Sequence, residues 1–121
     1  MENKPLKVIV DRTKWLRGEG DIHSKLLTID NKMCCLGFAA ISAGISRDMI
    51  TGRTSPAVVA KFFSKEFPLK MLVYDTPIPS NNPICKALMC ANDNENILDE
   101  EREKEIIKLG KEVGIEFEFI N

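Results

Sequence analysis

The stretch MCCLGFAAISAGIS, Met33 to Ser46, contains no charged residue and decides how the rest of the chain must be arranged. A helix made of these residues is apolar nearly all round, so it belongs in the core of the protein. Its small residues, among them Gly37 and Ala40, permit close approach of another backbone, and Gly44 suits the end of a helix. A buried strand is the competing interpretation, but the length and the alanine content favour a helix near 34–44. At 14 residues the uncharged stretch is too short for a membrane span, which needs ~20.

Strand-like and helix-like segments lie on both sides of this stretch. Four segments have the β-branched or alternating pattern of strands, near 6–10, 25–29, 70–75 and 115–120. Three further segments begin with the signals of a helix start, at Ser55-Pro56, at Asn82-Pro83 and at Asp99, which is expected to cap the last helix. We therefore predict a single α+β domain over residues 1–121, with an antiparallel or mixed sheet of about 3–4 strands packed against about 4 helices.

The composition is that of an ordinary globular domain. The chain has 121 residues, of which 44% are hydrophobic and 29% charged, and its formal net charge is −1. This near-neutral balance gives no electrostatic basis for non-specific binding to nucleic acid. The N-terminal MENKPLKVIVDR has too short an apolar run for a secretory signal peptide. We therefore expect a cytoplasmic protein that makes no membrane contact and keeps its thiols reduced.

The segment DRTKWLRGEGDIHSK, residues 11–25, holds the only Trp and the only His and places two glycines around Glu19. It lacks the spacing of a phosphate loop, and an expected strand follows it where a helix would be needed. Arginines beside glycine N–H groups and a flat indole can nevertheless hold an anionic, planar ligand such as a nucleotide. Two polar residues after the apolar helix near 83–91 could line the same kind of pocket. The predicted ligand-binding residues are Arg12, Trp15, Arg17, Glu19, His23, Asn92 and Asp93.

Simpler interpretations of both segments remain open. Trp15 and Leu16 can anchor the loop in the core while Arg17 and Glu19 are solvated. Asn92 and Asp93 can belong to a turn that ends a helix.

The four cysteines do not have the spacing of a structural metal site. Cys34 and Cys35 are adjacent, and on a helix they point roughly 100° apart, while Cys85 and Cys90 point roughly 140° apart. We therefore predict no metal and no cofactor, and we interpret the cysteines as buried free thiols. An alternative is a thiol hydrolase in which Cys34 or Cys35, in the first turn of a helix, uses His23 as its base.

The combination VDRTKWLRGEG … KMCCLGFAAISAG, with the later ALMCANDNEN … EEREKEIIKLGKEVGIEFEF, resembles small accessory proteins of bacteriophages and prophages. The resemblance covers most of the chain and implies a phage-encoded protein that acts in the host cytoplasm, for example against a host defence. It implies no catalytic residue and no cofactor.

Taken together, these observations predict a non-enzymatic binding protein. It would sequester a small anionic, nucleotide-type ligand or inhibit a host protein such as a defence component. A homo-oligomer is expected, because 121 residues offer limited concave surface and small domains often build sites between subunits. The alternatives are the thiol hydrolase and an interaction module that forms a homodimer through the strand Ile115 to Ile120.

Overall fold

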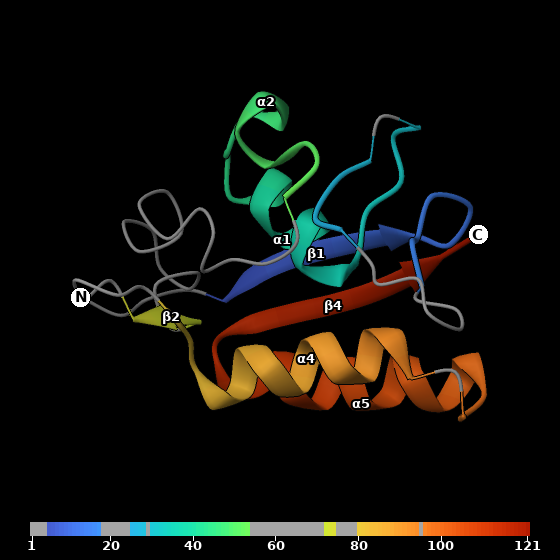
Figure 1. The fold of residues 1–121 in the computed structure, drawn as a ribbon. Helices are drawn as coiled ribbons and strands as arrows, with labels where there is room; N and C mark the ends of the chain where they lie inside the picture. Colours follow the sequence, from blue (N-terminus) through green and yellow to red (C-terminus); the bar gives the residue numbers. More distant parts are fainter. Residues whose placement is uncertain (1–4, 18–24, 29, 54–71, 75–79, 95) are drawn as a thin grey trace.

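A computed structural model describes residues 5–17, 25–28, 30–53, 72–74, 80–94 and 96–121 of the chain (Figure 1). The described helices are α1 (Cys35–Ser42), α2 (Arg47–Ile50), α4 (Pro83–Asp93) and α5 (Asp99–Glu112). The described strands are β1 (Leu6–Asp11), β2 (Val73–Tyr74), β3 (Ser80–Asn81) and β4 (Ile115–Ile120). The predicted α+β class is therefore confirmed.

The strand pairing differs from the prediction. β1 and β4 are parallel neighbours along their whole length, from Leu6 opposite Ile115 to Asp11 opposite Ile120. β2 and β3 form a separate antiparallel pair. The predicted single sheet of about three to four antiparallel or mixed strands is thus wrong for the described residues. Parallel neighbours need a long crossover between them, and here that crossover includes α4 and α5.

The segment near 25–29 does not form the predicted strand in its described part, residues 25–28. Leu26 and Leu27 are buried, but Leu27 makes only an isolated bridge, to Thr51. The backbone bonds instead to the turn after α2: Leu26 N–H donates to the Arg53 carbonyl at 2.8 Å, and Gly52 N–H to the Leu27 carbonyl at 2.7 Å. Two buried leucines therefore anchor an irregular segment, because its backbone groups bond to this turn rather than to β1. Residue 29 lies outside the described residues.

One face of the β1–β4 pair carries the core. Val8 and Val10 of β1 and Ile115 and Phe117 of β4 are at most 5% exposed, whereas the alternate positions are exposed except for Asp11, which is half-buried. α1 packs against β1, α5 packs against β4, and α4 contacts both helices (Figure 1). The period-two pattern predicted for the segment at 115–120 is confirmed, with its glutamates on the open face.

The uncharged stretch forms the predicted core helix, α1, in which every residue from Cys35 to Ala40 is buried. A Cβ atom on Gly37 would lie 1.8 Å from the Leu26 carbonyl oxygen, so only glycine permits this approach. Gly44 follows the helix with φ +93°, and the two backbone hydrogen bonds of a Schellman motif surround it. The predicted helix end at Gly44 is therefore confirmed.

The two C-terminal helices begin differently. α4 starts as predicted: the Asn82 side chain accepts a hydrogen bond from Cys85 N–H at 2.8 Å. The predicted cap of α5 at Asp99 is wrong, since Leu98 is the N-cap residue and no side chain caps the helix. The Asp99 carboxylate instead forms an ion pair with an arginine of the loop after β1. Gly114, at φ +82°, provides the turn from α5 into β4.

Two sequence predictions fall largely or wholly on residues that are not described. The helix expected after Ser55-Pro56 lies outside the described residues. Of the strand expected near 70–75 only 72–74 are described, and Val73–Tyr74 is β2. Within the described part of the chain, no helix is long and apolar enough to cross a membrane.

Candidate functional site at the Trp15 loop

The loop after β1 is fixed to the segment that leads into α1. Leu16 N–H donates to the Met33 carbonyl at 2.7 Å, and Met33 N–H donates to the Lys14 carbonyl at 3.0 Å. Trp15 lies between these two bonds and its side chain is only 4% exposed. Its ring centroid lies 4.8 Å from that of Phe119 on β4, so the loop is anchored to the sheet as well.

Asn92, in the last turn of α4, connects this loop to two helices. Its side chain is buried, and Oδ1 accepts hydrogen bonds from Trp15 Nε1–H at 2.8 Å and from Cys35 N–H at 3.0 Å. Its Nδ2 donates to the Leu16 carbonyl at 3.0 Å and to Asp93 Oδ1 at 2.9 Å. A buried polar group without such partners would cost about 1–3 kcal/mol, so this amide stabilises the junction of the loop, α1 and α4.

The burial and the hydrogen bond of the indole place Trp15 in the core rather than under a ligand. Arg17 covers the ring from the loop, with its guanidinium carbon 4.6 Å from the ring centroid. A cation at this distance is attracted by the indole π-system. Trp15 therefore supports Arg17 and holds its guanidinium at the protein surface.

Arg17 also faces the first residue of α5. Its Nη1 lies 2.5 Å from Asp99 Oδ2, and the two side chains are 27% and 54% exposed. The bond uses one guanidinium nitrogen and one carboxylate oxygen, and the carboxylate is open to solvent. Exposed pairs of this kind contribute about 0–1 kcal/mol to stability.

Arg102 reaches the same carboxylate from inside the protein. Only 5% of Arg102 is exposed, and Nη1–H donates to the Asn92 carbonyl at 3.1 Å. Its Nε lies 3.8 Å from Asp99 Oδ1, beyond hydrogen-bonding distance, and finds no acceptor among the described residues. Asp99 thus lies between two guanidinium groups. Its carboxylate bonds the guanidinium of Arg17 but is too far from the Nε–H of Arg102 for a hydrogen bond. Buried charged groups are usually fully paired, so this N–H group is an exception.

Arg12, a second arginine of the loop, forms more hydrogen bonds to its carboxylate partner than Arg17 does. Arg12 donates from Nε and from Nη2 to the two carboxylate oxygens of Glu103, at 2.9 and 2.7 Å. Bonding to the Glu103 carboxylate raises the pKa of Arg12 above its usual range. This bidentate pair ties the end of β1 to α5.

The structure brings together four of the seven residues predicted to bind a ligand. Trp15, Arg17, Asn92 and Asp93 form one connected group through the contacts given above. Arg12 lies in the separate pair with Glu103. Glu19 and His23 lie outside the described residues.

Sequence reasoning missed Arg102 as a member of this group. It lies four positions before Ile106 and therefore on the inner face that the apolar residues of α5 define. A charged residue on the apolar face of a helix was the signal that could have identified it.

The thiols near this group are buried. Cys34, Cys35 and Cys85 lie in the core, and Cys90 is exposed. Burial raises the pKa of Cys34 to about 11 and that of Cys85 to about 12, and it raises the pKa of Cys35 as well. These thiols stay protonated near neutral pH, which does not favour nucleophilic catalysis. No group of three or more His, Cys, Asp or Glu side chains among the described residues has an arrangement that suits a metal ion.

No family model, curated protein or solved structure matched this chain. The geometry of the side chains is therefore the main basis for inferring a function.

Proposed function

We propose that this chain is a non-enzymatic binding protein that takes a small anion, such as a phosphate group of a nucleotide-type ligand, between Arg17 and Arg102. The observation that carries the proposal is the buried Nε–H of Arg102, which has no acceptor within bonding distance among the described residues. The nearest carboxylate oxygen, from Asp99, lies 3.8 Å away. A phosphate oxygen could complete this contact and bond Arg17 at the same time.

Among the described residues, Asp99 supplies the carboxylate nearest to this N–H group. Its side chain is 54% exposed, so it can turn towards solvent when another anion enters. The ion pair that is lost contributes little, because both partners lie at the surface. Since Asp99 stays nearby after it is displaced, it keeps the affinity of the site for anions moderate.

Trp15 has a supporting role in this proposal. Its buried ring positions Arg17, which leaves recognition of the ligand to charge and hydrogen bonds rather than to stacking on the indole. We therefore expect the site to select for phosphate groups more than for the base of a nucleotide.

Thermal denaturation in the presence of inorganic phosphate, ADP or adenosine at matched ionic strength tests the proposal. Phosphate and ADP should raise the melting temperature, because they bind the folded state, whereas uncharged adenosine should not. Asp99→Asn should bind phosphate about tenfold more tightly, since it removes the competing charge. Arg17→Ala should lose the effect, and Arg102→Lys should weaken it, because lysine keeps the charge but lacks the Nε–H donor.

Arg12→Ala is the matched control. It removes a guanidinium from the same loop, but from the pair with Glu103, and should leave phosphate binding unchanged. The proposal fails if neither the wild-type protein nor Asp99→Asn is stabilised by phosphate. It fails also if Arg17→Ala binds as well as the wild type.

A phage-encoded protein with such a site would sequester an anionic signalling molecule in the host cytoplasm. The resemblance of the sequence to phage accessory proteins supports this role.

The thiol hydrolase is the weaker alternative, since the buried thiols have raised pKa values. The homodimer through β4 also stays a proposal: β1 occupies one edge of β4, and light scattering would measure whether a dimer forms.

A further inference from the structure

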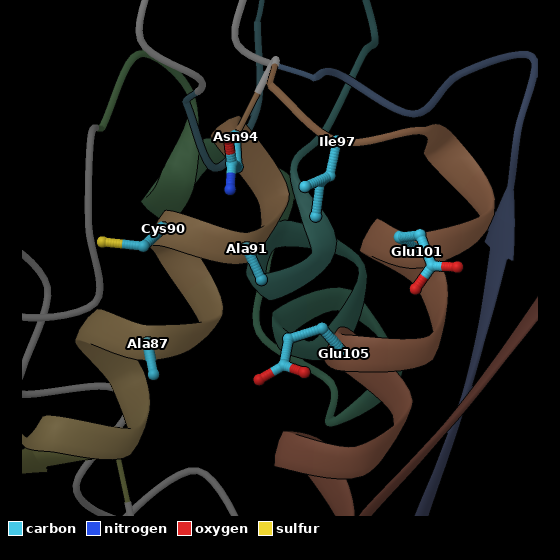
Figure 2. A pocket seen from close by; sticks show the side chains of 7 residues that line it. All are labelled: Ala87, Cys90, Ala91, Asn94, Ile97, Glu101 and Glu105. Carbon is cyan, nitrogen blue, oxygen red and sulfur yellow. The ribbon is translucent and has the colours of Figure 1, made fainter.

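A groove of about 420 Å³ lies on the outer side of α4 and α5 (Figure 2). α4 contributes small side chains, Ala87 and Ala91, one helical turn apart. α5 contributes two carboxylates, Glu101 and Glu105, also one turn apart. In Figure 2, Ala91 and Glu105 point into the gap between the two helices from opposite walls.

An apolar side chain closes one end of the groove, and an exposed one lies next to it in the chain. Ile97, in the connection between α4 and α5, lines its end. The neighbouring Leu98 is 74% exposed, the most exposed of the large hydrophobic residues described. The groove therefore combines a wall of small apolar side chains and an apolar end with one acidic wall, and Asn94 also lines it.

We infer that this groove binds a basic, amphipathic helix of a partner protein. Alanines on α4 allow another backbone to approach closely, as in the packing of a third helix against a helix pair. Two carboxylates one turn apart match Lys or Arg side chains at positions i and i+4 of the incoming helix. The Glu101–Lys104 ion pair is long, at 3.9 Å, and both side chains are more than half exposed, so an incoming cation can replace Lys104.

Charge excludes two other occupants. A nucleic acid would bring phosphates against the carboxylates of α5. A second copy seated symmetrically on the same groove would bring the acidic walls of both subunits into one interface, and no Lys or Arg among the described residues lines the groove to pair with them. A basic amphipathic segment of a different protein satisfies both the acidic wall of α5 and the alanine wall of α4.

The groove is separate from the proposed anion site. The anion would contact Arg17 and Arg102, and neither residue lines the groove. Variants of the groove can therefore be tested without removing a residue of the anion site.

Selection from a displayed library of random peptides of about 12 residues, long enough for three helical turns, tests this inference. The enriched peptides should carry basic residues three or four positions apart beside apolar residues. For the synthetic form of such a peptide, Glu101→Gln/Glu105→Gln should raise Kd by about tenfold or more, measured by fluorescence anisotropy. Circular dichroism of the variant checks that it is folded.

Glu116→Gln/Glu118→Gln is the matched control. It removes the same two charges from the open face of β4 and should change Kd by less than about twofold, because long-range charge effects are screened by salt. Equal losses of peptide affinity in the two double variants would show non-specific electrostatic attraction and would overturn the inference. Enrichment of peptides without basic residues, or no enrichment, would overturn it as well.

Cys90 provides a test of location. It lines the groove and is exposed, whereas the other three cysteines are buried, so a thiol-directed photo-cross-linker can be attached to it selectively. At a peptide concentration near the wild-type Kd, the labelled protein should cross-link the selected peptide, and Glu101→Gln/Glu105→Gln carrying the same label should cross-link much less of it. Binding without any cross-link would place the peptide elsewhere and contradict the inference.

Discussion

The loop after β1 joins two regions: a buried interior around Trp15 and Asn92, and a surface rim formed by Arg17 and Asp99. Trp15 bonds the buried amide of Asn92, whose nitrogen and oxygen both have protein partners. Arg17, two positions later, shares an exposed carboxylate with Arg102, whose Nε–H finds no acceptor among the described residues. The interior amide has a partner for both of its polar atoms, whereas the rim leaves the Nε–H of Arg102 without an acceptor among the described residues. The two regions should therefore respond to different changes.

The largest expected change in the free energy of unfolding comes from the buried thiols when the pH is raised. The folded state holds Cys34 at a pKa of about 11 and Cys85 at about 12, above the ordinary 9.0. Their contribution to stability is complete below pH 9 and is lost as the pH rises through the folded values, because only the unfolded state releases these protons. At pH 10 the loss should be roughly 3 kcal/mol for the two thiols together, measured by urea denaturation between pH 8 and 10.

Cys85→Ala should reduce this dependence on pH by roughly a third, since Cys34 and Cys35 keep their raised pKa values. Cys90→Ala changes an exposed thiol and should leave it unaltered. An unchanged pH dependence in Cys85→Ala would contradict the assignment of the effect to buried thiols.

The next effect tests the interior amide. Asn92→Ala leaves the indole N–H of Trp15, the backbone N–H of Cys35 and the carbonyl of Leu16 without this partner. We expect a loss of about 2 kcal/mol in the free energy of unfolding, measured in urea, because unsatisfied buried groups cost about 1–3 kcal/mol. A loss equal to that of a surface Asn96→Ala would show that the amide does not hold the junction.

The pair of Arg12 with Glu103 sharpens the comparison, because it is a charged pair at the surface that is geometrically complete. Glu103→Gln should lower the melting temperature by a few degrees, since it breaks a bidentate contact between β1 and α5. Differential scanning calorimetry measures the shift. The double variant with Arg12→Ala should add little more if the two residues act on each other.

The smallest expected effect is at the rim. Asp99→Asn should change the melting temperature less than Glu103→Gln does, because its pair with Arg17 is single and solvent-exposed. Salt of about 1 M, where the screening length is ~3 Å, should reduce the Asp99→Asn effect further. An Asp99→Asn shift larger than that of Glu103→Gln would contradict a displaceable carboxylate.

Local patterns in the sequence were sufficient to predict most of the described helices. The absence of charge from 33–46 predicted the core position of α1, and Asn82 before Pro83 predicted the start of α4. The alternation at 115–120 predicted which face of β4 is buried. It did not predict the neighbour of that strand, because alternation determines a face and not a pairing direction.

The candidate site was harder to predict, since its parts come from distant positions. Trp15 and Asn92 are 77 positions apart, and nothing in either segment specifies the other. Each residue was predicted from its own segment as a ligand-binding candidate. Only the fold shows that their side chains are bonded to each other. Their bond also explains why the indole is not available for a ligand. The sequence alone left open whether Trp15 lies in the core or against a ligand.

The parallel pairing of β1 with β4 has a consequence for synthesis. Asp11 and Asn121, which bond at 3.3 Å, are 110 positions apart in the chain. Because a chain is made from its N-terminus, β1 leaves the ribosome long before the strand that pairs with it exists. Until then Val8 and Val10 lack the neighbouring strand beside which they are buried, and contacts over such separations also form slowly. In a nascent chain of this protein, α1 can therefore cover β1 early, but the parallel pair can form only after β4 has emerged.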